Sequence, residues 1–361
     1  MRIRTFTLLV VLAMLVAACS PAGTSDSTST TGAEATTTTG TPAPEPMQLA
    51  YSLESGTSYA FEVGLDQTID LSTTGDASAL GEGDVPGQMS ISVTGTSVFT
   101  YSVADGPESG TYAVTITGDF SDLQFTGTVD GEPVAADDIP DFANMEPVDV
   151  TVIVDEQGNV IPDQSGLEDD LFGMGGLDML GQLGSTGATG QFVGPPFTED
   201  EVTVGDTWSE TVETPTMPGS DPITTKIESE VVSTDTVDGH DVFVIDTITT
   251  TSPISFDLGE LLAGFMTAFV PEDASEEELA QLDEIVSQIK FAFSVDETVG
   301  HLKTWFDYEA GLARNAEYAS TTHLVMDINM PDDTTNELVA FGMDMNVSQD
   351  VTYHLTDAPS A

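Results

Sequence analysis

The stretch MSISVTGTSVFTYSV, residues 89–103, decides the fold that we expect. Apolar side chains stand at alternate positions in it, at Val93 in its first half and at Phe99, Tyr101 and Val103 in its second, with Ser and Thr between them. A period of two is typical of a β-strand that has one buried and one exposed face. The stretch therefore predicts a strand whose Ser and Thr side chains face water.

The same alternation continues on both sides of this stretch, broken by turns rich in Gly, Asp and Asn. It predicts a mainly β fold of antiparallel sheets, built either as an open half-barrel or as two related β lobes. The segment 97–120 can be laid beside 229–250, because each reads as strand, Asp-Gly turn, strand. On this parallel we expect a first lobe over 47–165 and a second over 198–357.

Two segments interrupt the β pattern. Residues 166–197, rich in Gly, Met and Leu, are expected to connect the lobes. Residues 258–290 predict a helical hairpin inserted into the second lobe, since apolar residues recur there at helical spacing. Ser275 and Glu278 stand at the positions of a capping box at the start of the second helix. Plain packing of both helices against a sheet is the simpler interpretation.

The chain contains one cysteine, Cys19, directly after a positive n-region and a short apolar run. The run is too short for a membrane span, which takes about 20 apolar residues, but it suits a secretory signal over 1–18. The sequence Val16-Ala17-Ala18-Cys19 resembles the lipobox of bacterial lipoproteins. That resemblance implies cleavage after Ala18 and attachment of a diacylglyceryl group to the Cys19 sulfur. An incidental cysteine in a secreted precursor is the alternative.

Residues 19–46 contain almost no large apolar side chains. Such a segment buries too little surface to offset its ordering entropy, so we expect a disordered, Ser/Thr/Pro-rich tether behind the lipidated cysteine. Anchor and tether together resemble those of actinobacterial surface lipoproteins. They imply a protein held on the extracytoplasmic face of the cell membrane.

The charge balance excludes some partners. The chain has 62 acidic residues against six basic ones, a formal net charge of −56, and two of those six lie in the predicted signal. Long-range repulsion from such a charge argues against nucleic acid and against anionic lipid headgroups as partners. A solvated acidic surface suited to salt is the simplest interpretation, and loosely held divalent cations are the alternative.

Motifs of known chemistry are missing from the sequence. It contains no G-x-S-x-G elbow, H-E-x-x-H pair, P-loop, C-x-x-C pair or EF-hand calcium loop, so we expect no enzyme, cofactor or metal site. The four histidines stand at no ligand spacing; they are His240, His301, His323 and His354. An enzyme would need a cluster of histidine, acid and hydroxyl groups assembled by the fold.

Both tryptophans of the chain, Trp208 and Trp305, lie in strand-like stretches of the second lobe. We expect them to anchor its core, because strand tryptophans bury a large area. Stacking against a carbohydrate is the alternative, and it would need exposed aromatic side chains on one face.

Three blocks resemble a family of bacterial lipoproteins of undefined function: PFTEDEVTVGDTW (196–208), VDGHDVFVIDT (237–247) and GHLKTWFDYEAGL (300–312). This resemblance implies no catalytic residue. The order of the elements and the lipidation are also similar to LolA-like and LppX-like lipoproteins. In those, an open antiparallel half-barrel holds helices against its concave face, which implies an apolar cavity for acyl chains.

The leading hypothesis is a non-enzymatic, membrane-anchored β domain that binds a hydrophobic or lipid ligand in a β-sheet cavity. Residues expected to line that cavity lie in the two segments that interrupt the β pattern: Phe172, Met174, Met179, Phe265, Met266 and Phe269. The alternative is a structural or adhesive cell-surface protein in which those segments complete the core. The sequence names neither a ligand nor a protein partner.

Overall fold

The computed structural model describes residues 45–75, 87–118, 122–134, 148–158, 160–161, 195–214, 222–257, 290–331 and 338–356. The prediction of a mainly β fold with antiparallel sheets is confirmed, because every strand pair in these ranges is antiparallel and no helix occurs in them. The predicted helical hairpin at 258–290 lies outside the described residues except for Lys290, which is in a strand.

The strands follow one another along the chain with turns or undescribed segments between them. They are β1 (Met47–Gln48), β2 (Ser58–Gly75), β3 (Gln88–Asp105), β4 (Thr111–Gly118), β5 (Gln124–Val129), β6 (Glu132–Pro133), β7 (Val148–Asp155), β8 (Val160–Ile161), β9 (Glu201–Val202), β10 (Thr207–Thr214), β11 (Ile223–Val237), β12 (His240–Thr251), β13 (Ile254–Asp257), β14 (Lys290–Val295), β15 (Thr298–Asp307), β16 (Leu312–Pro331) and β17 (Leu338–Thr356).

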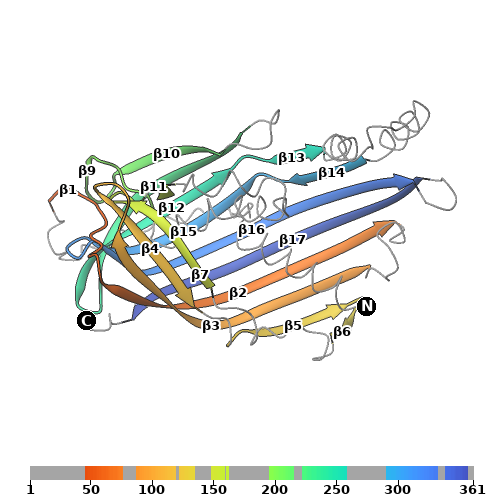
Figure 1. Ribbon diagram of the computed structural model, residues 1–361, viewed down its shortest axis with the longest axis horizontal. Helices are drawn as coiled ribbons and strands as arrows, with labels where there is room; N and C mark the ends of the chain where they lie inside the picture. Colours follow the sequence, from red (N-terminus) through yellow and green to blue (C-terminus); the bar gives the residue numbers. More distant parts are fainter. Residues whose placement is uncertain are drawn as a thin grey trace, which may run out of the picture.

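All strands except the pair β1–β9 belong to one sheet of 15 strands in the described residues (Figure 1). Its main path runs β10-β11-β12-β15-β16-β17-β2-β3-β4-β7-β8. The four strands in the middle, β16, β17, β2 and β3, have 18 to 20 residues each. At about 3.3 Å per residue they extend roughly 60 Å and form the long axis of the molecule.

The long strands change partners along their length. Toward one end β16 pairs with β15 and β3 pairs with β4, while toward the other end β16 pairs with β14 and β3 pairs with β5. On each side of its four long strands the sheet therefore splits into two branches, one toward each end of those strands. We call the part with β4, β7 and β10–β12 the closed end and the part with β5, β13 and β14 the far end (Figure 1).

The strand alternation separates two faces of the sheet. On β2 the odd-numbered side chains Val63, Ile69 and Leu71 are buried, whereas Asp66 and Asp70 between them are exposed. The face that carries the odd residues of β2 is called the inner face. The outer face of the long strands consists mainly of Ser, Thr, Asp and Asn, so it is a hydrated surface.

Strands from both predicted lobes are joined in this one sheet. The junction is the pair β17–β2, which runs in unbroken register from Phe341↔Gly75 to Thr356↔Ala60. The residues expected to connect the lobes, 166–197, are described only from Pro195 onward. The division into lobes at 47–165 and 198–357 stays a prediction.

The segment that contains Met47 and Tyr51 and the segment that contains Val202 are distant in sequence, and together they cover the inner face at the closed end. Met47 pairs with Val202 in the short β1–β9 ladder, and the Tyr51 amide donates to the Glu156 carbonyl. Gly311, in the β15–β16 turn, has φ +66° and approaches the same segment so closely that a Cβ there would lie 2.6 Å from the Ser52 nitrogen. Any side chain at this position would displace the covering segment.

Candidate ligand-binding face

The inner face at the closed end carries the larger apolar cluster, called cluster 1. Phe197 lies at its centre, with its ring centroid 4.9 Å from that of Tyr51 and 4.6 Å from that of Phe306. The Trp208 indole packs at the edge of cluster 1 and donates a 2.8 Å hydrogen bond to the Pro196 carbonyl. These contacts make cluster 1 the core that joins the covering segments to the sheet.

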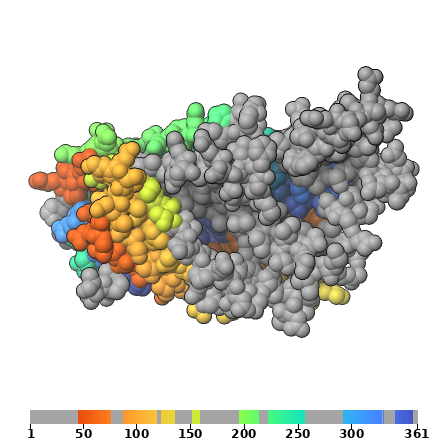
Figure 2. Space-filling model, in the orientation of Figure 1, coloured from red at the N-terminus to blue at the C-terminus, as the bar shows by residue number. Residues whose placement is uncertain are grey.

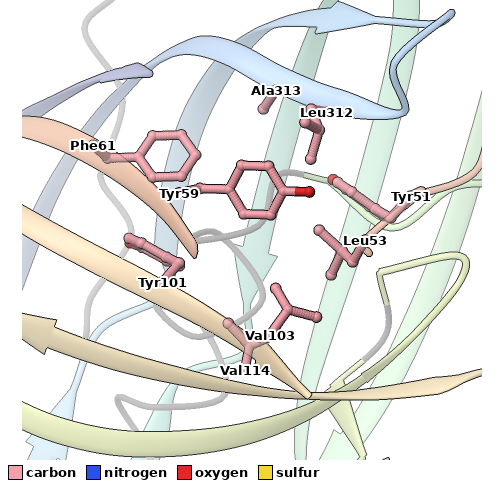
Figure 3. A pocket seen from close by; sticks show the side chains of 9 residues that line it. All are labelled: Tyr51, Leu53, Tyr59, Phe61, Tyr101, Val103, Val114, Leu312 and Ala313. Atoms are coloured by element: carbon pink, nitrogen blue, oxygen red, sulfur yellow. The ribbon is translucent and has the colours of Figure 1, made fainter. Parts of the chain in front are cut away.

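A small pocket remains inside cluster 1 (Figure 3). Its volume is about 30 Å³, enough for roughly one or two water molecules and far below the several hundred Å³ of ordinary ligand sites. The lining is almost wholly apolar or aromatic: Tyr51, Leu53, Tyr59, Phe61, Tyr101, Val103, Val114, Leu312 and Ala313. Cluster 1 is therefore a filled core rather than a binding site.

A second apolar cluster, called cluster 2, lies on the inner face toward the far end. Its buried members come from β2, β3, β14, β16 and β17: Ile69, Leu71, Met89, Ile91, Val93, Phe293, Val295, Leu324, Phe341, Met343, Met345 and Val347. Three of them are methionines, whose flexible thioether side chains adapt to irregular shapes. Cluster 2 is the part of the described inner face that suits an apolar ligand chain.

A row of polar side chains separates the two clusters. Strand register places Gln67 opposite Gln349, Gln349 opposite Ser320, Ser320 opposite Gly300 and Gly300 opposite Thr249, across β2, β17, β16, β15 and β12. All four polar members of this row are buried. On β2 and β17 the inner positions on both sides of the row are apolar, so the row interrupts the apolar face there. It ends at Val93 on β3 and at Ile227 on β11, which stand opposite Gln67 and Thr249.

Four buried hydroxyl groups on the inner face, two of them in or next to this row, lack hydrogen-bond partners among the described residues. They are the side-chain oxygens of Ser97, Thr304, Ser320 and Thr322, whose residues are 7%, 0%, 4% and 1% exposed. A buried polar atom without a partner costs about 1–3 kcal/mol, so each calls for an explanation. The neighbouring pair Ser229 and Thr247 is satisfied by a mutual 2.9 Å hydrogen bond.

The basic residues whose side chains are described lie away from this face. Lys226 pairs with Glu228 at 2.7 Å, Lys303 lies 5.5 Å from the Trp305 ring centroid, and Arg314 bonds Asp307. Neither cluster and no position of the polar row contains a basic side chain. The described inner face therefore offers a ligand hydrogen bonds and apolar contact but no positive charge.

One acidic group shares the inner face near the end of the polar row. Ile227 on β11 stands opposite Thr249, the last polar residue of the row, and Glu210 on β10 stands opposite Ile227. Burial raises the pKa of Glu210, and the negative charge of Asp155 on β7 raises it further. This acid makes the end of the row unfavourable for an anion.

Asp307 organises the turn between β15 and β16. It is 1% exposed, and its Oδ2 accepts hydrogen bonds of 3.1 and 2.8 Å from Arg314 Nε and Nη2. Its Oδ1 accepts the backbone N–H groups of Glu309 and Ala310. Burial alone would raise the pKa of Asp307, but the Ala310 amide and the Arg314 guanidinium hold it below its ordinary value. These bonds indicate a structural role.

His323 bridges two carboxylates on the outer face. Its Nδ1 lies 2.7 Å from Asp296 Oδ2, and its Nε2 lies 3.3 Å from Asp344 Oδ2. Hydrogen bonds to these acids raise the pKa of His323 despite its partial burial. Among the described residues no group of three or more His, Cys, Asp or Glu could hold a metal ion.

The sequence prediction for the tryptophans is half right. Trp208 packs against cluster 1 as expected. Trp305 was expected in the core and this is wrong: it alternates with the inner residues Thr304 and Phe306, so it lies half-buried on the outer face. The alternation of β15 is regular from Thr298 to Phe306, so the period of two by itself places Trp305 on the face opposite to Phe306.

None of the residues predicted for the ligand or for lipidation can be placed. Cys19 and Ala18 lie outside the described residues, as do the six predicted cavity residues, Phe172, Met174, Met179, Phe265, Met266 and Phe269. The polar row was missed, although a signal for it exists. In β2 the inner series Val63, Leu65, Gln67, Ile69 is apolar except for its glutamine.

Comparison with known proteins names no family. No protein-family model matches the chain, and no curated protein sequence matches it. Three crystal structures of Pseudomonas aeruginosa proteins, OccK7 (OpdD), the outer membrane protein OprG and OpdQ, align with 83%, 84% and 83% of this chain and 99%, 99% and 97% of their own. Their identities are 6%, 6% and 7% and their TM-scores 0.20, 0.13 and 0.16, too low to support an argument. No helix in the described ranges has the length and apolar character needed to cross a membrane.

Proposed function

We propose that this protein is a non-enzymatic lipoprotein, anchored to the extracytoplasmic face of the cell membrane, that binds a hydrophobic or amphipathic ligand on the inner face of its sheet. One observation carries the ligand part of this proposal. The inner face of the long strands continues past the filled core of cluster 1, across the polar row, into the methionine-containing cluster 2.

The anchor part of the proposal rests on the sequence. Val16-Ala17-Ala18-Cys19 resembles a lipobox, and diacylglyceryl on Cys19 with a further acyl chain satisfies the rule that stable anchoring takes more than one chain. Behind it, the tether to residue 46 would hold the domain away from the bilayer. The resemblance to the lipoprotein family of undefined function, and to LolA-like and LppX-like lipoproteins, agrees with this placement.

A structural or adhesive surface protein is the second candidate. It is favoured by the small size of the pocket in cluster 1, since about 30 Å³ cannot hold a lipid. On the side that Figure 2 shows, the described residues of the closed end form a continuous surface. In this alternative, cluster 2 is a second core.

Mass spectrometry of bound lipid separates the two candidates. The full chain carrying Cys19→Ala would be exported from a bacterial host, purified without detergent and extracted with organic solvent. The carrier function predicts about one hydrophobic molecule per chain. The structural function predicts none, together with a melting temperature unchanged by added fatty acids and acylglycerols.

A matched pair of substitutions locates the ligand. Val347 is 2% exposed in cluster 2, and the next residue, Ser348, is exposed on the outer face. Val347→Trp should fill part of the site and lower the extracted ligand at least about fivefold, while Ser348→Trp should leave it unchanged. Circular dichroism melts of both variants show whether the fold persists. Equal ligand in both variants would remove cluster 2 as the site.

A further inference from the structure

The polar row holds more hydrogen-bonding capacity than the described residues use. Ser320 and Thr322 lie two residues apart on β16 and therefore face the same side, and neither side-chain oxygen has a hydrogen-bond partner in the part of the chain that the structure describes. Next to them in register, Gln67 Nε2 lies 3.5 Å from Gln349 Oε1, a long contact that uses one donor and one acceptor of the two amides. The row thus presents hydroxyl and amide groups to the inner face.

Buried groups of this kind keep their energetic cost unless something supplies partners. Such partners are other groups of the protein, ordered water or a bound polar group. The row borders cluster 2, where Val347 and Ile69 stand opposite each other one inner position further along β17 and β2. A molecule whose apolar part lies on cluster 2 would bring its polar part to the row.

The charge of the surroundings restricts what that polar part can be. The row and both clusters contain no basic side chain, and the nearest acid along the register is Glu210. The chain as a whole has a net charge of −56. A carboxylate or phosphate buried here would lose its hydration without gaining a counter-charge, whereas a neutral hydroxyl, ester or amide would find donors and acceptors.

We infer that Ser320, Thr322, Gln67 and Gln349 form a polar subsite that selects uncharged amphipathic ligands over anionic ones. This inference rests on the proposed function and specifies its ligand class. The hydroxyls and amides bind the neutral polar group, and cluster 2 binds the apolar chain.

Binding of two probes that share one acyl chain tests the selection. The probes are 1-monooleoylglycerol, which is uncharged, and oleate, which is ionised at pH 8.5, each below its aggregation concentration. Binding to the full-length Cys19→Ala chain would be followed by isothermal titration calorimetry. We expect the neutral probe to bind at least about tenfold more tightly. Equal or tighter binding of oleate would overturn the inference and leave the proposed function standing, while binding of neither probe would count against both.

Isosteric substitutions test the residues. Thr322→Val removes the buried hydroxyl and keeps the shape, and Thr321→Val makes the same change at the exposed neighbour on the outer face. We expect Thr322→Val to weaken monooleoylglycerol about fivefold, the value of one neutral hydrogen bond, without lowering the melting temperature. Thr321→Val should change neither quantity. Undiminished affinity in Thr322→Val and in the corresponding Ser320→Ala would show that these hydroxyls do not contact the ligand.

Discussion

Gln67 and Gln349 stand directly opposite each other on β2 and β17, with Gln67 Nε2 3.5 Å from Gln349 Oε1, although 282 residues separate them in the chain. Both side chains are buried, at 5% and 7% exposure. The pair marks the place where the N-terminal and C-terminal parts of the chain meet inside one sheet. It also divides the apolar inner face into its two clusters.

Removing one of these amides should cost more than removing both. Gln67→Leu or Gln349→Leu alone leaves the other amide buried with one partner fewer, so we expect each to lower the free energy of unfolding by about 1–2 kcal/mol. The double substitution should return to within about 1 kcal/mol of the wild type, because no buried amide remains. Urea unfolding of the four proteins completes the cycle. Additive losses would show that the pair does not interact.

His323 should make stability depend on pH. The neighbouring Asp296 and Asp344 raise its folded-state pKa above the ordinary value of 6.5. Its stabilising contribution is therefore fully present below pH 6.5 and is lost as the pH rises through the folded-state pKa. The difference in melting temperature between wild type and His323→Gln should shrink between pH 6 and pH 8.5. His301→Gln, at an exposed position, is the control, and a constant difference for His323→Gln would contradict the prediction.

Asp307 should be the costliest outer carboxylate to replace. The Asp307 side chain is 1% exposed, so Asp307→Asn leaves the Arg314 guanidinium without its charge partner at a buried position. We expect this substitution to lower the free energy of unfolding by about 3 kcal/mol. Because its folded-state pKa is lowered, the contribution persists above pH 3.8 and disappears as the pH falls through the folded-state pKa. Asp246→Asn, at an exposed position of β12, should cost little in the same denaturation experiment. Equal losses in the two variants would refute this role.

Salt should stabilise the protein strongly. With a formal net charge of −56, self-repulsion opposes the compact state, and the Debye length falls from about 10 Å at 0.1 M salt to about 3 Å at 1 M. We expect the melting temperature to rise by several degrees between 0.05 and 1 M NaCl. A series in a neutral osmolyte of equal osmolality separates screening from exclusion effects. A flat response to NaCl would show that the charges are spaced too widely to repel.

Cys19 should decide where the protein resides. Cys19→Ala removes the sulfur that would carry the diacylglyceryl group, so the exported chain should move from the membrane pellet to the soluble fraction. Radiolabelled palmitate should enter the wild type and not the variant. Ser20→Ala, one position further on, should change neither result. A membrane-bound, unlabelled wild type would point to another mode of attachment.

Strand alternation in the sequence, from Val93 to Val103 and in many similar stretches, was enough to predict antiparallel β structure and to separate the polar from the apolar face. This information is local, because the period of two is set by the backbone of each strand. The inner position of Gln67 could be seen in the same way. Trp305 was misplaced because its large apolar ring was taken as the sign of a core position, although the regular alternation of β15 puts it on the face opposite to Phe306.

The sequence by itself determined the strand character, the polarity of each face, the charge and the candidate anchor at Cys19. Only the tertiary structure decided that β17 pairs with β2 and that Gln67, Gln349, Ser320 and Thr249 form one row. The physical reason is that register between strands hundreds of residues apart depends on the packing of the whole inner face. No short stretch of sequence contains that information.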